Sequence, residues 1–118
     1  MQYNLTAAPA SQPRNALYAQ IFALLTCYIL HKFENLNRFQ RAAIAPTIVN
    51  TVTARLGIIH PPSGAAAAAF AYQKVSEVDM LLFLFGVVIS TFIAVIINNL
   101  SDRRQYPSTS WAVFKVFF

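Results

Sequence analysis

The feature that most constrains the fold is a run of 21 residues, positions 80–100, without a charged side chain. As an α-helix this run would be about 31 Å long, which matches the hydrocarbon thickness of a bilayer. Of the 118 residues, 57% are hydrophobic and only 11% are charged, whereas soluble domains have about 25% charged residues. The sequence therefore predicts an integral membrane protein with one all-α domain.

Two further segments, residues 16–30 and 42–59, are predicted to cross the membrane, which gives a polytopic helical bundle of about three spans. The second is the more polar of the two, because it carries Pro46, Asn50 and Arg55. Polar residues within a span tend to face a bundle interior or a cavity. Arg55 has two interpretations, since its side chain either snorkels to the interface or pairs with an anion near the following motif.

A break in the helix is predicted at His60-Pro61-Pro62. Proline fixes φ, lacks a backbone N–H and disfavours the α conformation in the residue before it, so we expect His60 and Pro61 to lie outside any helix. Ser63 is predicted to cap a short helix over residues 64–72. Irregular backbone at membrane depth survives only where protein or a water-filled cavity surrounds it, which makes the break a candidate site.

The predicted helix start after Ser63 has the chemistry of an anion site. Free amides and the positive end of the helix dipole favour a small anion, and Gly64 would allow close approach to the backbone. His60 would add a charge that switches with pH and couples anion binding to protons. The alternative is that the ring only bonds to backbone, in which case the motif is a structural break.

The net charge of +5 is spread along the chain beside apolar segments, which favours membrane topology over nucleic-acid binding. Three crossings place six basic residues on one side, namely Lys32, Arg38, Arg41, Arg103, Arg104 and Lys115. The other side receives Arg14 and Lys74, with Arg55 if it snorkels outward. This alternation predicts that the tail at Ser108 lies on the side of Lys32.

An enzyme is not expected. The four acidic residues lie in predicted loops, and no Ser/His/Asp spacing stands out. His31 and His60 are 29 positions apart and make a poor metal site, so neither a metal nor a cofactor is predicted. Cys27 is the one cysteine and excludes an internal disulfide framework.

Three motifs, in order and spacing, resemble the HPP family of integral membrane proteins, which is named after its His-Pro-Pro motif. They are Gln12-Pro13-Arg14-Asn15, then His60-Pro61-Pro62 with Gly64-Ala65, then Asn98-Asn99-Leu100 with Tyr106-Pro107 and Trp111. The resemblance runs from about residue 2 to residue 111 and is closest to fungal members. Two departures are the polyalanine after Gly64 and Ala8-Pro9-Ala10-Ser11 in place of Ser-Pro-x-Ala.

The resemblance implies a multi-pass membrane protein, since members are typically described with four transmembrane helices. Members are regarded as transporters, and plant members are linked to nitrite uptake into chloroplasts. We therefore expect transport of a small inorganic anion such as nitrite, with the lipid bilayer and the anion as partners, and assembly as a homo-oligomer. In the family a membrane hairpin precedes Gln-Pro-Arg-Asn, and here Met1 falls just before that motif. The alternative is therefore a shortened, non-transporting fragment or an accessory subunit that packs with other helices.

The expected organisation is a polar segment over residues 1–15, a transmembrane domain over 16–111 and a short hydrophobic tail over 112–118. Asn15 is expected to cap the first span, and Arg14 is either an interfacial anchor or part of a site. The candidate substrate-binding residues are Arg14, Asn15, Arg55, His60, Ser63 and Gly64. The structural motif residues are Pro61, Pro62, Asn98 and Asn99.

Overall fold

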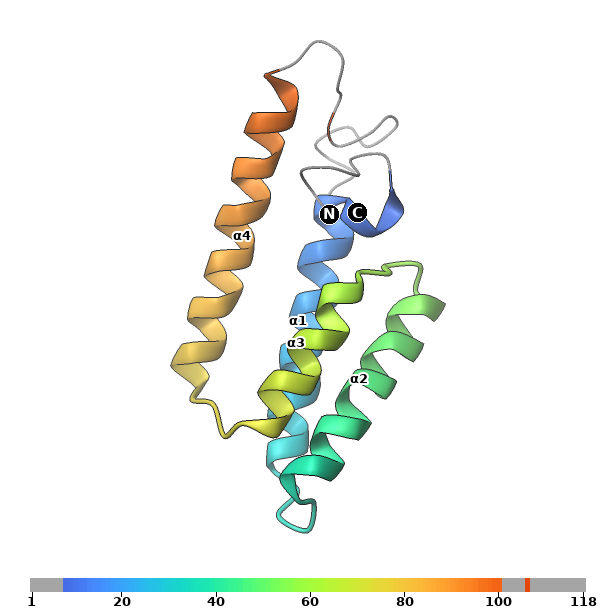
Figure 1. Ribbon diagram of the computed structural model, residues 1–118, viewed down its shortest axis with the longest axis vertical. Helices are drawn as coiled ribbons and strands as arrows, with labels where there is room; N and C mark the ends of the chain where they lie inside the picture. The colour runs from blue at the N-terminus through green and yellow to red at the C-terminus, as the bar shows by residue number, and fades with distance from the viewer. Residues whose placement is uncertain (1–7, 101–105, 107–118) are drawn as a thin grey trace.

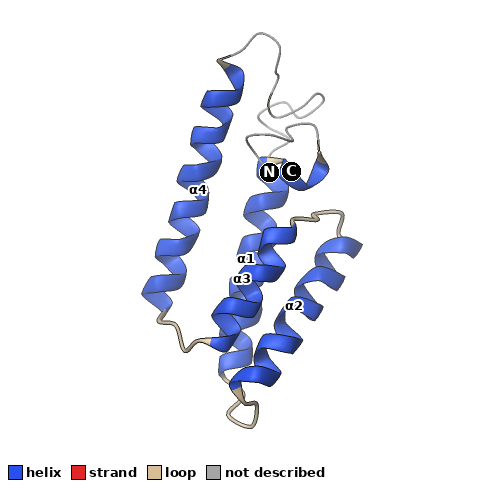
Figure 2. Ribbon diagram, viewed as in Figure 1, coloured by secondary structure: helices blue, strands red, loops and turns tan. Residues whose placement is uncertain are grey.

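The computed structural model describes residues 8–100 and 106, and within them the chain is all-α (Figures 1 and 2). A 3-10 turn precedes four helices, and no strand occurs among these residues. The elements are η1 (Pro9–Ser11), α1 (Pro13–His31), α2 (Arg38–Arg55), α3 (Pro61–Tyr72) and α4 (Glu77–Asn99). The predicted fold class is confirmed at this level.

Successive helices alternate in direction along the long axis (Figure 1). α3 packs against both α1 and α2, whereas α4 packs on α1. One end of the bundle carries η1, the linker over residues 56–60 and the C-terminal end of α4, and we call it the motif end. The opposite end carries the loops over residues 32–37 and 73–76, and we call it the loop end.

The sequence predicted that Lys74 and Lys32 lie on opposite sides, and the direction of α3 contradicts this prediction. This helix has 12 residues, about 18 Å at 1.5 Å per residue, and it carries the chain back alongside α2. Lys74 therefore lines the same loop-end cavity as Lys32, and α4 ends at the motif end, where Asn99 bonds to Tyr106. Ser108 and residues 112–118 lie outside the described residues.

All four α-helices begin earlier than the sequence predicted. α1 begins at Pro13 with Gln12 as its N-cap residue, so Asn15 lies in the first turn and is not the cap. Proline suits the first helical position because the N–H it lacks would have no partner there. α2 and α4 begin with capping boxes, Asn37 with Gln40 and Ser76 with Asp79, in which side chain and backbone bond reciprocally.

Gly57, and not the proline pair, ends α2. It has φ +67°, and its N–H donates to the carbonyl of Ala54 at 3.2 Å, while the N–H of Ile58 donates to Thr53 at 3.0 Å. This pair of bonds is the Schellman motif, which favours glycine in the left-handed conformation. α2 thus stops four residues before the predicted end of the span at residue 59.

α3 begins at Pro61, so the prediction that this proline lies outside the helix and that Ser63 is the cap is wrong. His60 is the N-cap residue, in the extended conformation (φ −145°, ψ 94°), as a residue before proline should be. Pro61 and Pro62 occupy the first two helical positions, where no N–H is required. The break between α2 and α3 is as predicted, but it spans residues 56–60.

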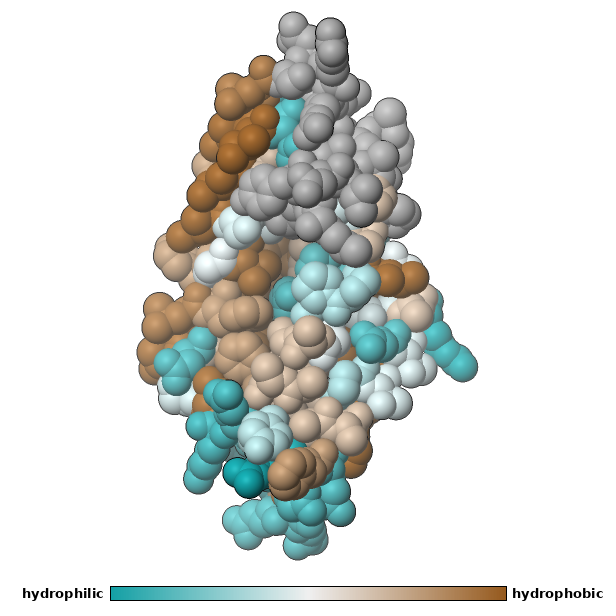
Figure 3. All heavy atoms as spheres, viewed as in Figure 1, coloured by the Kyte–Doolittle hydropathy of each residue, from teal (hydrophilic) through white to brown (hydrophobic). Residues whose placement is uncertain are grey.

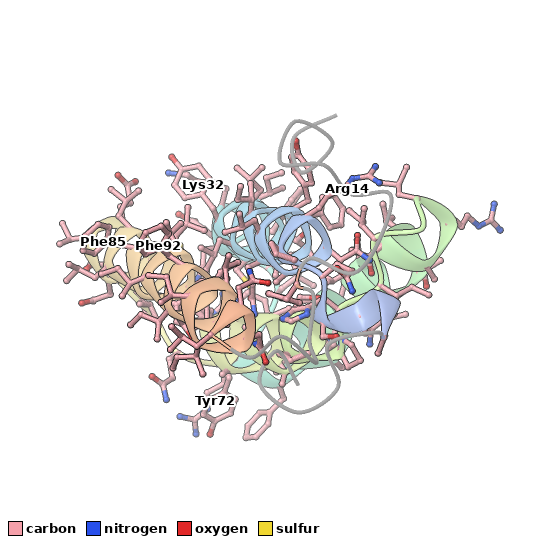
Figure 4. All side chains as sticks on the ribbon, turned by 90° about the horizontal axis from the view of Figure 1, so that it is seen from above. Arg14, Lys32, Tyr72, Phe85 and Phe92 are labelled. Atoms are coloured by element: carbon pink, nitrogen blue, oxygen red, sulfur yellow. The ribbon has the colours of Figure 1, made fainter. Side chains whose placement is uncertain are left out.

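Among the described residues, α4 is the one helix that is both long and apolar enough to cross a membrane. Only 17% of its most apolar stretch is buried in the protein, and its outer side, including Phe85 and Phe92, is exposed (Figures 3 and 4). α1 and α2 are less apolar, so hydropathy alone does not confirm the three predicted spans.

Replacing Gly57 tests the end of α2. An added Cβ meets no atom within 4 Å there, so Gly57→Ala should cost only the left-handed backbone, about 1 kcal/mol. Gly86 is also uncrowded but lies inside α4, where alanine is better than glycine by roughly 0.5–1 kcal/mol. Thermal unfolding in detergent should show a lower Tm for Gly57→Ala and an equal or higher Tm for Gly86→Ala. Equal losses in both variants would contradict this account.

Candidate functional site

The interior of the bundle is apolar toward the loop end and polar toward the motif end. The hydrophobic core cluster is Ala23, Leu24, Cys27, Leu30, Ala45, Val49, Ala67, Ala71 and Met80. The buried polar side chains nearer the motif end are Ser11, Gln12, Asn15, Gln20, Thr53, His60, Ser63, Thr91 and Asn98. We call this second group the polar cluster. Buried polar side chains are costly in a membrane protein and usually mark function.

The three sequence motifs meet at the motif end through hydrogen bonds. Nδ1 of His60 bonds to the carbonyl of Ala10 at 2.7 Å, two residues before the first motif. The hydroxyl of Tyr106 donates to the carbonyl of Ser11, and Tyr106 exchanges two backbone–amide bonds with Asn99. His60 lies 50 residues after Ala10, and Tyr106 lies 95 residues after Ser11. These hydrogen bonds therefore join distant segments of the chain to η1.

His60 makes the backbone bond that the structural alternative predicts. Its partner is a carbonyl, so Nδ1 must carry the proton and donate. The ring is 8% exposed, and this burial lowers the pKa of His60 below its usual value because it disfavours the charged form. The charge switch proposed for this residue thus requires a more acidic pH than an exposed histidine would.

The first three residues of α3 offer no free amide to an anion. Pro61 and Pro62 have no N–H. The N–H of Ser63 donates to the carbonyl of His60 at 2.9 Å, and its hydroxyl donates to the same oxygen at 2.7 Å. Ser63 therefore closes the first turn of the helix and does not present donors outward.

Gly64 allows close approach of a side chain rather than of an anion. A Cβ at this position would lie 2.5 Å from Oδ1 and 2.9 Å from Nδ2 of Asn50. The carboxamide of Asn50 on α2 thus packs on the backbone of α3. A cleft of about 270 Å³ lies beside this contact and is lined by Asn50, Thr53, Ile59, His60 and Pro61.

The two candidate arginines do not line that cleft. Arg14 is half-buried in the first turn of α1 and lies at the edge of the bundle (Figure 4). Arg55 is exposed in the last turn of α2, where a positive charge complements the helix dipole. Asn15 is buried and belongs to the polar cluster.

His31 and Arg41 bond to the C-terminal end of α3. The sequence predicted no site role for either residue. Nε2 of His31 bonds to the carbonyl of Phe70 at 2.9 Å. Arg41 donates to the carbonyls of Ala71 and Leu36 at 3.4 and 3.0 Å. The last carbonyls of a helix have no partner within it, so these side chains from α1 and α2 complete α3.

A family model described as the transmembrane region of HPP proteins matches residues 1–107. No curated protein and no solved structure matches the chain.

The contact between Gly64 and Asn50 predicts a coupled pair of substitutions. Gly64→Ala should lower stability, because the new methyl group overlaps the carboxamide and overpacking costs typically 1–3 kcal/mol. In Gly64→Ala/Asn50→Ala the overlap disappears, so much of the loss should be recovered. Thermal unfolding of the two single variants and the double variant gives the coupling energy. Additive losses would show that the contact does not restrict residue 64.

Proposed function

The chain belongs to the HPP family of integral membrane proteins, and from this premise we propose that it transports a small inorganic anion, such as nitrite, across a membrane. The activity proposed is transport rather than catalysis and needs no cofactor. The observation that supports it best is the polar cluster, which lies inside a protein whose outer α4 surface is apolar.

The chemistry of the polar cluster suits weak, reversible binding. Its members carry amides, hydroxyls and an imidazole, and none carries a full charge at neutral pH. A pathway must bind its ion strongly enough to admit it and weakly enough to release it. Arg14 and Arg55 lie at the same end of the bundle, where they would raise the local concentration of anions.

The proposed topology is multi-pass, with α1, α2 and α4 crossing the membrane and α3 lying between α1 and α2. α1 and α2 have 19 and 18 residues, about 28 and 27 Å, close to the thickness of the hydrocarbon core. Asn15 and Gln20 lower the hydropathy of α1, but both are buried. Its exposed face includes Ile21 and Leu25, which suit contact with lipid.

Gln20 offers a sharp test of the transport proposal. It is 4% exposed, and its Oε1 has no hydrogen-bond partner among the residues that the structure describes, so Gln20→Leu should leave stability equal or higher. If the polar cluster forms the pathway, nitrite uptake into proteoliposomes should fall at least tenfold. The matched control is Thr47→Val, which removes a hydroxyl from the exposed side of α2 and should leave uptake unchanged.

The outcomes separate the proposal from its alternative. Unchanged uptake in Gln20→Leu at normal protein level would remove the polar cluster from the pathway. Wild-type uptake equal to that of empty liposomes, with the protein correctly inserted, would favour the accessory-subunit alternative. That alternative is supported by the side chains of His60, Ser63 and Tyr106, which bond to backbone carbonyls.

Labelling of single cysteines tests the topology. In a background with Cys27→Ala, cysteines at Lys32 and Lys74 should react from the same side of the membrane, because α3 returns the chain to the loop end. A cysteine at Arg55 should react from the opposite side. Labelling of position 74 together with position 55 would contradict the return through α3 and restore the simple charge alternation.

A further inference from the structure

An apolar groove runs between α1 and α4. Its volume is about 330 Å³, and its lining includes Ile21 and Leu25 from α1 and Leu81 and Leu84 from α4. All four side chains are hydrocarbon, and Leu25 and Leu81 are more than half exposed. The groove has the chemistry to accept a hydrocarbon chain.

A second, polar cavity of about 530 Å³ lies at the loop end, beyond the groove. Three cationic side chains line it, Lys32, Arg41 and Lys74, together with the carboxylates Glu34 and Glu77. Arg41 is held in place by its bonds to backbone carbonyls, so it supplies a fixed positive charge. Lys32 and Lys74 are exposed and can adjust to a ligand.

The groove and the cavity are continuous, because Tyr28, Glu77 and Met80 line both. Nζ of Lys32 lies 4.7 Å from the centroid of the Tyr28 ring, which places a cation where the apolar lining ends. Figure 4 shows Lys32 on the side of the bundle where α1 and α4 face each other. Tyrosine and lysine are typical of the level of lipid headgroups.

We propose that this composite site binds a glycerophospholipid. One acyl chain lies in the groove between α1 and α4, and the phosphodiester lies in the loop-end cavity against Lys32 and Lys74. The geometry matches the ligand in order, since hydrocarbon lining is followed by an aromatic ring and then by cations. The inference rests on membrane location and not on anion transport.

Neither a free anion nor a neutral glyceride uses the whole site. Inorganic phosphate would gain from the cations but not from the groove. A diacylglycerol would fill the groove but leave the cations without a phosphate. Basic pockets beside transmembrane helices recognise phosphate headgroups in this way.

Native mass spectrometry of the full chain, with lipids added in detergent, tests the proposal. The probes are phosphatidylglycerol, phosphatidylcholine and diacylglycerol with identical acyl chains, and inorganic phosphate as a competitor. We expect both phospholipids to be retained at least tenfold better than diacylglycerol, and inorganic phosphate not to displace them. Lys32→Gln and Lys74→Gln should each weaken retention about fivefold, and Leu25→Trp should weaken it by filling the groove.

Arg55→Gln is the matched control, because it removes an exposed cation at the motif end and should not change retention. The Tm of each variant shows that it is folded. The proposal is overturned by equal retention of diacylglycerol and phospholipid, by displacement with inorganic phosphate, or by full retention in the folded lysine variants. If a glutamine variant does not fold, the double variant Lys32→Arg/Lys74→Arg is used instead. It keeps both positive charges and should therefore retain phospholipid as the wild-type protein does.

Discussion

The structure depends on satisfying the two ends of α3, a short helix that packs against α1 and α2. In a membrane each unsatisfied backbone group costs several kcal/mol, and a helix of 12 residues leaves such groups at both ends. At its start, Pro61 and Pro62 remove two donors, and Ser63 uses the third on His60. At its end, His31 and Arg41 supply donors from neighbouring helices. Pro61 and Pro62 thus favour the start of α3 and do not prevent residues 61–62 from being helical.

Hydrogen bonds also connect the segments that carry the three motifs. His60 and Tyr106 both bond to carbonyls of η1, and Asn99 secures Tyr106 from α4. The motifs are therefore parts of one junction, which encloses the polar cluster at the motif end. Because these bonds join side chains to backbone atoms, the junction fixes where helices start and stop.

Local chemistry allowed much of this to be predicted. The charge-free run identified α4, and proline sterics identified the extended His60. The capping boxes at Asn37 and Ser76 and the helix stop at Gly57 were not predicted, although the residue types and their spacing carry both signals. The return of α3 was not predictable in the same way, because a polyalanine helix is apolar on every side and has no period that shows its direction. The contact of Asn50 with Gly64 depends on that return, so it was hidden as well.

The attachment of α4 has a consequence for how the protein is made. Among the helices, α4 packs mainly on α1, with a ring contact between its Phe83 and Phe70 of α3, and most of its surface faces outward. A segment of this kind can leave the translocon by itself, because its own side chains favour lipid. α1, α2 and α3 cover polar groups for one another, so they must leave together or wait for each other. On this reasoning we expect insertion to treat the described helices as one self-inserting helix and a cooperative group of three, which Tyr106 links through its bonds to Ser11 and Asn99.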